Sequence, residues 1–406
     1  MSPQMMIAGA AALAGLLAQS GCGSTPAEAP PLPEPDGEVV RVATVQQLQT
    51  AVREARSGIT ILIAPGTYTL EMCLYLTGGV QDVAIRGETG RPEDVLIIGR
   101  GMANEDYGSV PHGILVGDAQ DVLIADLTIR DVWYHPIQLD GPSGCARPHI
   151  YNCRLINAGQ QFIKGTVDKA GNGVDGGVVE YTLMAYETTA RSDYTDGVDV
   201  LGGAGWIIRH NRFVNIRAPE GQLAGPSVLM WRGCTDTICE GNWFVNCQRG
   251  IAFGLASDNP QDHRGGVIRN NIFHRGPDSP GDAGIIVWNS PGTRVLHNTV
   301  LLSGTYPNAI EYRFPATTGV QIIGNLTDAA ITRRDEASAE LRGNVTSAAP
   351  AWFVDAASGD LHLLPDAPVP RVQRHPECAV DFDGDPRPEG EPTPAGADVP
   401  QPGGGE

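Results

Sequence analysis

One short pattern returns along the chain and limits what it can fold into. Residues 206–215 read WIIRHNRFVN, residues 237–246 read TICEGNWFVN and residues 266–275 read GVIRNNIFHR. Each copy has two or three apolar residues, a variable pair, an Asn and then an aromatic or branched residue. Aligned on the Asn, the copies fall at Asn211, Asn242, Asn271, Asn298, Asn325 and Asn344, with Thr182, Cys153 and Leu127 in the earlier places.

A period in the twenties or low thirties, built from short apolar runs, predicts a solenoid. Helical repeats need long amphipathic segments, whereas these runs are short, β-branched and broken by Gly, Asn, Asp and Pro. An Asn buried at the same turn of every coil would donate to one neighbouring coil and accept from the other. The pattern over residues 40–365 resembles that of right-handed parallel β-helix proteins. The expected fold is therefore all-β, a single right-handed parallel β-helix with an Asn ladder.

The start of this region predicts a short capping helix. Thr44 is a good N-cap, with Gln47 three residues later. One face of the helix would carry Val45, Leu48, Val52 and Ala55. Such a helix would cover the first coil, which otherwise leaves unpaired strand edges.

The first residues resemble a bacterial lipoprotein export signal. An apolar run from about Met5 to Leu17 is too short to span a bilayer and ends in small residues before Cys22. Two features depart from the pattern, since no Lys or Arg precedes the run and Gln19 stands where Leu is usual. The expectation is an exported cell-envelope protein, lipid-anchored through Cys22 and facing the periplasm or the cell surface. Cleavage without lipidation is the alternative.

The chain divides into four parts: an export signal at 1–22, a Pro-rich linker at 23–38, the β-helix at 39–365 and a C-terminal extension at 366–406. The linker is expected to be an extended spacer. The extension is rich in Pro and Gly, and disorder is expected after about Pro388.

Charge and cysteine content exclude some partners and sites. The formal net charge of -19 argues against nucleic acid, because phosphate binding needs basic stripes. Seven cysteines follow Cys22, an odd number that leaves at least one thiol unpaired. They form no CxxC pair, so a zinc site is not supported. Cys153 and Cys239 fall at core positions of the repeat, where buried thiols are expected. The protein is expected to be a monomer.

The strand after each Asn turn should present its outward residues in columns along the solenoid. Strand alternation predicts that the following side chains point inward: Ile137, Leu139, Ile163, Val198, Val200, Ile251, Phe253, Ile285, Val287, Ile310 and Tyr312. The side chains predicted to point outward are Gln138, Asp140, Lys164, Asp199, Met230, Arg232, Trp288, Glu311 and Arg313, with Tyr134, His135 and Gln160 close by. Mixed charges and an indole on an elongated surface suit a polysaccharide. A solvated sheet face with cross-strand ion pairs is the alternative.

The coils that hold Lys164 and Asp199 carry long insertions, at 166–177 and 185–197. Loops on a rigid scaffold often carry binding residues. The second insertion contributes Tyr194 and the carboxylates Glu187, Asp193 and Asp196, which could hold Ca²⁺ or pair with Lys164.

Several segments, including GQQFIKG, YTDGVDV, RGIAFGL and AIEYRF, look like those of a group of exported bacterial right-handed β-helix proteins. More distantly, the chain is similar to β-helix polysaccharide lyases of the chondroitinase-B and alginate-lyase type. In those lyases an outward Lys and Arg act as base and acid, and Ca²⁺ or other cations neutralise the uronate. The resemblance implies β-elimination on an acidic polysaccharide, with Lys164 as base, Arg232 or Arg209 as carboxylate clamp and Tyr194 or His135 as proton donor. The pair Arg209 and His210 looks like the RH pair of the lyases but lies before the Asn turn.

Two other functions stay open at this point. A glycoside hydrolase or uronate epimerase would rely on carboxylates, for which Asp199 with Asp140 or Asp196 are the candidates. A non-catalytic, surface-anchored solenoid would bind glycan or protein through residues such as Trp288 and Arg313.

Overall fold

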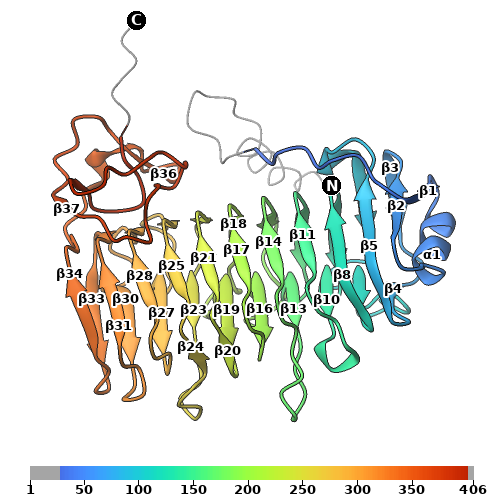
Figure 1. Cartoon of the computed structure of the whole chain (residues 1–406), viewed down its shortest axis with the longest axis horizontal. Helices are drawn as coiled ribbons and strands as arrows, with labels where there is room; N and C mark the ends of the chain where they lie inside the picture. Colours follow the sequence, from blue (N-terminus) through green and yellow to red (C-terminus); the bar gives the residue numbers. More distant parts are fainter. Residues whose placement is uncertain (1–27, 401–406) are drawn as a thin grey trace, which may run out of the picture.

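The computed structural model describes residues 28–400, and three parallel sheets run along this part of the chain (Figure 1). Each coil adds one strand to each sheet in turn, and each strand pairs in parallel with its counterparts in the neighbouring coils. The prediction of a single parallel β-helix is confirmed.

The sheets are numbered here in chain order. Sheet 1 contains β1 (Glu38–Val42), β2 (Ile59–Ile63), β5 (Val80–Gly87), β8 (Ala119–Ala125), β11 (His149–Tyr151), β14 (Val178–Glu180), β17 (Ile207–Arg209), β21 (Ile238–Glu240), β25 (Val267–Arg269), β28 (Arg294–Leu296), β31 (Val320–Ile323) and β34 (Ala339–Arg342). Sheet 2 contains β3 (Gly66–Thr69), β6 (Val95–Ile98), β9 (Thr128–Val132), β12 (Arg154–Ala158), β15 (Leu183–Ala185), β18 (Arg212–Val214), β22 (Trp243–Val245), β26 (Ile272–His274), β29 (Thr299–Leu301) and β32 (Leu326–Thr327). Sheet 3 contains β4 (Leu74–Leu76), β7 (Ile114–Val116), β10 (Ile137–Leu139), β13 (Ile163–Gly165), β16 (Val198–Leu201), β19 (Val228–Trp231), β23 (Ile251–Phe253), β27 (Ile285–Trp288), β30 (Asn308–Arg313) and β33 (Ala330–Arg334). Three two-stranded pairs complete the strands: β20 (Cys234–Thr235) with β24 (His263–Arg264), β35 (Phe353–Asp355) with β36 (Asp360–Leu363), and β37 (Arg371–Gln373) with β38 (Pro392–Pro394).

The predicted Asn ladder occupies the turn between sheets 1 and 2. From Asn211 to Asn325, each ladder Asn donates a side-chain N–H to the amide oxygen of the next at 2.9 to 3.0 Å. The same oxygens accept the backbone N–H of the preceding ladder residue. In the coil before Asn211, Thr182 joins the ladder through its backbone N–H, 3.0 Å from the Asn211 oxygen. The ladder thus satisfies polar groups that water cannot reach.

The inward positions predicted for sheet 3 are all buried in the core. The outward assignment of Met230 is wrong, because Met230 pairs with Val200 and Phe253 and is fully buried. Strand β19 begins at Val228, so alternation turns Leu229 and Trp231 outward. Arg232 follows the end of the strand, at a positive φ of 55°.

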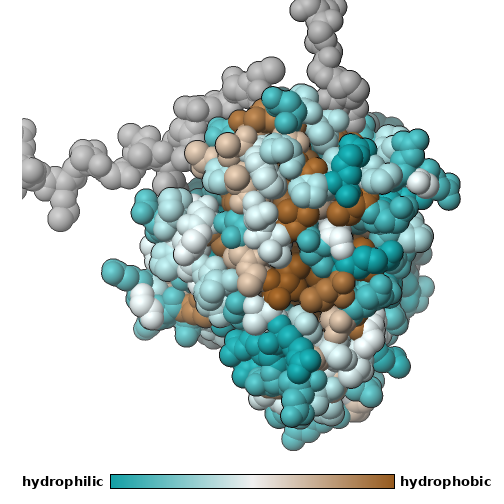
Figure 2. Space-filling model, turned by 90° about the vertical axis from the view of Figure 1, so that its left-hand side faces the viewer, coloured by the Kyte–Doolittle hydropathy of each residue, from teal (hydrophilic) through white to brown (hydrophobic). Residues whose placement is uncertain are grey.

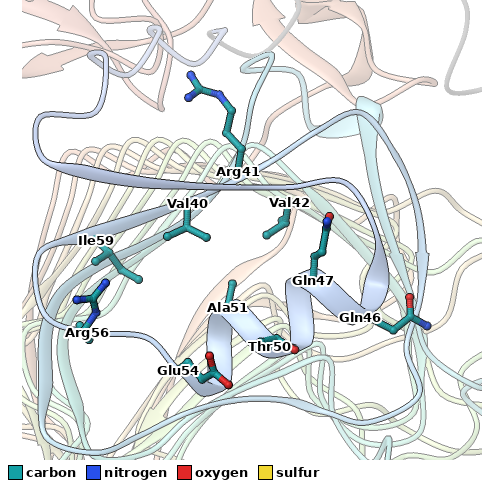
Figure 3. Close-up of a pocket in the computed structure, with 10 residues that line it drawn as sticks. All are labelled: Val40, Arg41, Val42, Gln46, Gln47, Thr50, Ala51, Glu54, Arg56 and Ile59. Atoms are coloured by element: carbon teal, nitrogen blue, oxygen red, sulfur yellow. The ribbon is translucent and has the colours of Figure 1, made fainter.

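Helix α1 (Val45–Arg53) covers the first coil as predicted (Figure 3). The Thr44 hydroxyl accepts the N–H of Gln47 at 3.2 Å, and the Gln47 side chain accepts the N–H of Ala43 at 2.9 Å. Leu48 and Val52 are buried against the coil. The helix therefore closes the N-terminal end of the core, and a recess of about 450 Å³ remains between it and β1.

The described part of the Pro-rich linker lies on the solenoid, where an extended spacer was expected. Arg86 donates to the carbonyl oxygens of Pro33 at 2.6 Å and Leu32 at 3.3 Å. The Tyr151 hydroxyl donates to the carbonyl oxygen of Pro30. These two side chains, from β5 and β11, hold the segment across the outer face of sheet 1.

The C-terminal extension is folded where disorder was expected. Its β37 and β38 pair antiparallel, and Phe382, Ala395 and Ala397 are buried in a cluster with outward residues of sheet 2. Trp243 of β22 belongs to this cluster, and its indole N–H donates to Gly359 at 3.0 Å. Composition alone predicted disorder because it does not register that this part of sheet 2 presents apolar side chains that need cover.

Other expectations concern cysteines and membrane spans. All seven cysteines from Cys73 to Cys378 are free thiols, and six of them, including Cys153 and Cys239, are buried. No helix within residues 28–400 is long and apolar enough to cross a membrane. Cys22 and the rest of the predicted export signal lie outside the described residues.

Candidate active site

An ion pair lies in one outward column of sheet 3. Gln138, Lys164 and Asp199 are cross-strand neighbours on β10, β13 and β16. The ammonium of Lys164 contacts the carboxylate of Asp199, although the two residues are only 8% and 1% exposed. The other carboxylate oxygen of Asp199 accepts the indole N–H of Trp231 at 2.9 Å.

The fold itself does not require charge in this column. The next three positions along it are Leu229, Ala252 and Ile286, which are also buried. Removing two charges from water costs several kcal/mol per ion, and apolar residues can replace such a pair at little cost. A polar cluster in this setting is therefore a candidate for function.

Asp196 adds a second buried carboxyl beside this pair. One of its oxygens accepts the side-chain N–H of Gln161 at 3.0 Å, and the other has no hydrogen-bond partner among the described residues. Burial, together with the nearby charge of Asp199, raises the pKa of Asp196 to about 8. Burial also raises the pKa of Asp199, but Lys164 and Trp231 oppose that rise. The site thus combines a carboxyl that stays protonated at neutral pH, that of Asp196, with a carboxyl that contacts the ammonium of Lys164.

His135 borders the cluster as predicted, but its charge state does not suit the predicted role. Its Nδ1 lies 3.1 Å from the carbonyl oxygen of Gln161, and the ring of His112 stacks on it at 5.2 Å. Burial lowers the pKa of His112 to about 4 and also lowers that of His135. A neutral imidazole is a poor proton donor to a leaving group, so the structure argues against His135 as the general acid.

Of an aromatic group beside the site, the sequence reasoning named Tyr134 but not its other members. The guanidinium of Arg191 lies 3.7 Å from the centre of the Trp133 ring, and Tyr107 stacks on the same indole at 5.1 Å. Tyr134 contacts Tyr107 edge-on at 5.6 Å. The residues come from three different coils, so only coil stacking brings them together.

Tyr194 lies near Lys164, and Arg232 contacts the indole that bonds Asp199. The Tyr194 side chain is 53% exposed, and its ring centre lies 6.0 Å from the Lys164 nitrogen. The guanidinium of Arg232 lies 4.9 Å from the ring of Trp231, which bonds Asp199. Arg232 also pairs with Asp258 at 3.2 Å. Trp231 therefore connects Arg232 to the Lys164 site. The sequence reasoning named Arg232 but not its neighbour Trp231, which makes the contact.

Further along sheet 3, Trp288 pairs in register with Arg313, whereas Glu311 follows Ile286 in the column of Lys164 and Asp199. Arg313 lies 5.0 Å from the centre of the Trp288 ring and pairs with Asp335. Glu311 accepts hydrogen bonds from Asn308 at 2.5 Å and from Tyr306 at 3.2 Å, and it pairs with Arg334 at 3.0 Å.

Four predicted residues do not belong to the central cluster. Arg209 lies on sheet 1 and pairs with Glu180 at 2.5 Å, while His210 stacks on Tyr181 at 5.2 Å. The assignment of Arg209 and His210 to the same site as Lys164 is therefore not supported. Asp140 follows β10 and accepts the hydroxyls of Ser143 at 2.6 Å and Thr166 at 3.1 Å. Gln160 offers its backbone oxygen to the hydroxyls of Tyr186 and Thr195.

The proposed carboxylate set for Ca²⁺ is not assembled as a group. Glu187 pairs with Arg130 at 2.9 Å, Asp196 is buried beside Gln161, and the Asp193 backbone donates to Gln222. Across residues 28–400, one group places three potential metal ligands within 4.8 Å of one another, and it consists of His362, Asp383 and Asp398. That group lies between β36 and the C-terminal extension.

Comparisons with known proteins identify the fold. No protein-family model and no curated protein matches the chain. Among solved structures, the pectate lyase Pel9A is similar with a TM-score of 0.61 at 13% identity, over 89% of this chain and 96% of that one. The GH136 lacto-N-biosidase from Eubacterium ramulus has a TM-score of 0.49 at 11% identity, over 76% of this chain and 65% of that one. PfbA, a surface adhesin of Streptococcus pneumoniae, has a TM-score of 0.47 at 13% identity, over 74% and 86%. The likeness to Pel9A confirms the right-handed parallel β-helix fold.

Proposed function

We propose that this protein is an exported, carbohydrate-active β-helix that cleaves an acidic polysaccharide by β-elimination on the outward face of sheet 3. The observation that carries the proposal is the buried pair of Lys164 and Asp199, in a column that the next coils fill with apolar residues. The fold shared with the pectate lyase Pel9A adds support by analogy.

β-Elimination needs a cation at the uronate carboxylate, a base for the proton α to it and a donor to the leaving oxygen. Since Asp199 holds Lys164 in an ion pair, Lys164 fits the cation role better than the role of base. Arg232, stacked on Trp231, supplies a second positive charge. Tyr194, whose ring centre lies 6.0 Å from the Lys164 nitrogen, is then assigned both proton steps. As the phenolate it takes the proton α to the carboxylate, and it returns that proton to the leaving glycosidic oxygen as the C–O bond breaks and the C=C bond forms.

Further along sheet 3, Trp288 and Arg313 extend the same surface, and they are assigned to hold more distant sugars. Export and lipid anchoring through Cys22 belong to this proposal, because they would place the site among envelope or environmental polysaccharides. Ca²⁺ is proposed only as an aid to uronate binding, and the assay below is therefore run with and without Ca²⁺.

Asp196 supports hydrolysis as a second candidate. A carboxyl with a pKa of about 8 beside a paired carboxylate is the combination that glycoside hydrolases use as acid and base. Both carboxyls are at most 4% exposed, so this route requires the 185–197 insertion to move.

The test incubates the purified protein with a panel of uronate polysaccharides, with and without Ca²⁺, and follows the ultraviolet absorbance of unsaturated uronates. We expect a rise that Lys164→Ala and Tyr194→Phe abolish. The matched control is Arg209→Ala, which removes a rival cation on sheet 1 and should keep full activity. Reducing ends without absorbance would favour hydrolysis. Neither signal on any polymer would contradict both catalytic candidates and favour the glycan-binding solenoid.

A further inference from the structure

The two ends of the solenoid are finished differently. At the N-terminal end α1 lies across the first coil, and its exposed positions include the polar residues Gln46 and Gln47 (Figure 3). At the C-terminal end, apolar side chains gather in the middle of the face (Figure 2). Leu341 of β34, the last strand of sheet 1, is 49% exposed, and the partly buried Ala339 of β34 and Ile331 of β33 pack against the core. Within residues 28–400 no helix covers this end, so apolar surface that a capping element usually hides stays open.

The last strand of sheet 1 also has an unpaired edge. Strand β34 ends the strand order of the sheet, and among residues 28–400 its one partner strand is β31. The carbonyl oxygen of Arg342 faces β31, where it accepts the N–H of Gly324 at 3.0 Å. Backbone groups alternate in direction along a strand, so the N–H and C=O of Leu341 point to the free edge.

The charges on this edge are arranged symmetrically about Leu341. Glu340 precedes it and Arg342 follows it, and both side chains are about half exposed. Within one copy the two side chains pair with each other at 3.5 Å, so binding of a second copy would exchange this pair for two pairs between copies. When two such strands meet in antiparallel fashion with Leu341 opposite Leu341, each Glu340 lies opposite an Arg342. The same three residues would therefore complement themselves across a twofold axis.

We propose that the C-terminal end of the solenoid binds a second copy of this chain, through antiparallel pairing of the two β34 strands about Leu341. The two Leu341 residues exchange backbone hydrogen bonds, two Glu340–Arg342 pairs flank them, and the apolar patch of each copy covers the other. This dimer replaces the monomer expected from the sequence, and it does not depend on the proposed function.

A second copy in this orientation fits better than a head-to-tail stack. A head-to-tail contact would place the polar outer face of α1 against the apolar patch, and it would continue into filaments rather than close. The contact consists of one short strand and a small apolar patch from each copy. Because a stable interface buries roughly 800 Å² per partner, this dimer should be weak and concentration-dependent. The net charge of -19 adds repulsion between copies, which salt screens.

Sedimentation equilibrium of the purified protein over a concentration series tests the proposal. Glu340→Arg or Arg342→Glu alone should weaken dimerisation about tenfold, because like charges then face each other at both pairs. The double variant E340R/R342E should restore the wild-type dissociation constant, since the opposite charges are only exchanged. Leu341→Lys should abolish the dimer, and thermal melting should verify that each variant is folded.

The matched control is Met72→Lys, which adds a charge at a similarly exposed apolar residue, 45% accessible, far along the chain. It should leave dimerisation unchanged. A protein that stays monomeric at all concentrations overturns the proposal. So does a double variant as weak as the single ones, which would mean that Glu340 and Arg342 do not face each other, or a series of oligomers that does not stop at two.

Discussion

Lys164 on β13 and Asp199 on β16 face each other across neighbouring strands and form an ion pair that is buried on the outside of the solenoid wall. Their column continues with Leu229 and Ala252, so the same strand geometry supports both a charged and an apolar filling. This allows the contribution of the pair to stability to be separated from its contribution to chemistry.

Exchanging the pair for apolar residues should therefore preserve the fold and remove activity. Lys164→Met alone should lower the free energy of unfolding by about 3–5 kcal/mol, because it leaves Asp199 buried without its partner charge. The double variant K164M/D199L should recover most of that loss. Thermal and urea unfolding of the three proteins would measure this. A double variant as unstable as the single one would mean that the pair stabilises the fold directly.

Asp196 should make stability fall as the pH rises. Its folded-state pKa of about 8 lies above its ordinary value of 3.8, so between these two values the unfolded chain has released a proton that the folded chain retains. Stability should thus decline from about pH 4 to about pH 8 and stop declining above that. Asp196→Asn keeps an oxygen for the Gln161 hydrogen bond and cannot ionise.

The melting temperature of Asp196→Asn relative to the wild type should accordingly rise between pH 5 and pH 8. Asp258→Asn, at a carboxylate whose side chain is 75% exposed, is the control and should show no such trend. A constant difference between the wild type and Asp196→Asn across the range would mean that Asp196 is ionised in the folded protein.

The architecture could be predicted because it depends on local pattern and period. Regular recurrence of the Asn located the turn between sheets 1 and 2, and alternation located the inward residues of sheet 3. The outward position was predicted correctly where inward apolar residues set the alternation clearly, as beside Lys164 and Asp199. The prediction failed at Met230, because the strand begins at Val228 and a shift of one residue exchanges the two faces.

The rest of the site depends on contacts between coils that no local pattern encodes. Arg191 meets Trp133 only because loops of unequal length fold over the same edge of sheet 3. The order in the C-terminal extension has a similar origin, since its Pro- and Gly-rich sequence is held by the apolar outer residues of sheet 2. In both cases the structure depends on tertiary contacts that the local sequence does not reveal.

The Asn ladder should be most sensitive at its buried middle rungs. Asn271→Ala removes an oxygen that accepts the backbone and side-chain N–H groups of Asn242, and it removes donors to Asn298 and Cys239. Each buried polar group left unpaired costs about 1–3 kcal/mol, so we expect a loss of at least about 3 kcal/mol. Asn344→Ala, at the half-buried last rung, should cost clearly less, and thermal melting of both variants would compare them. Equal losses would argue that burial does not set the strength of the rung.

Alkaline pH should loosen the C-terminal extension through His362. Its imidazole contacts Asp360 at 2.5 Å and Asp383 of the extension at 3.0 Å. Burial disfavours the charged ring, but the two carboxylates outweigh burial and raise the pKa of His362 to about 10. Because the folded-state pKa lies above the ordinary 6.5, the stabilisation is fully present below pH 6.5 and is lost as the pH rises towards 10. Hydrogen exchange, corrected for its intrinsic pH dependence, should therefore show falling protection of the Thr393 amide relative to the amides of β22 over that range, since Thr393 carries the one backbone N–H of β38. In His362→Gln the two strands should keep a constant ratio, and the same result in the wild type would mean that the charged imidazole does not hold the extension.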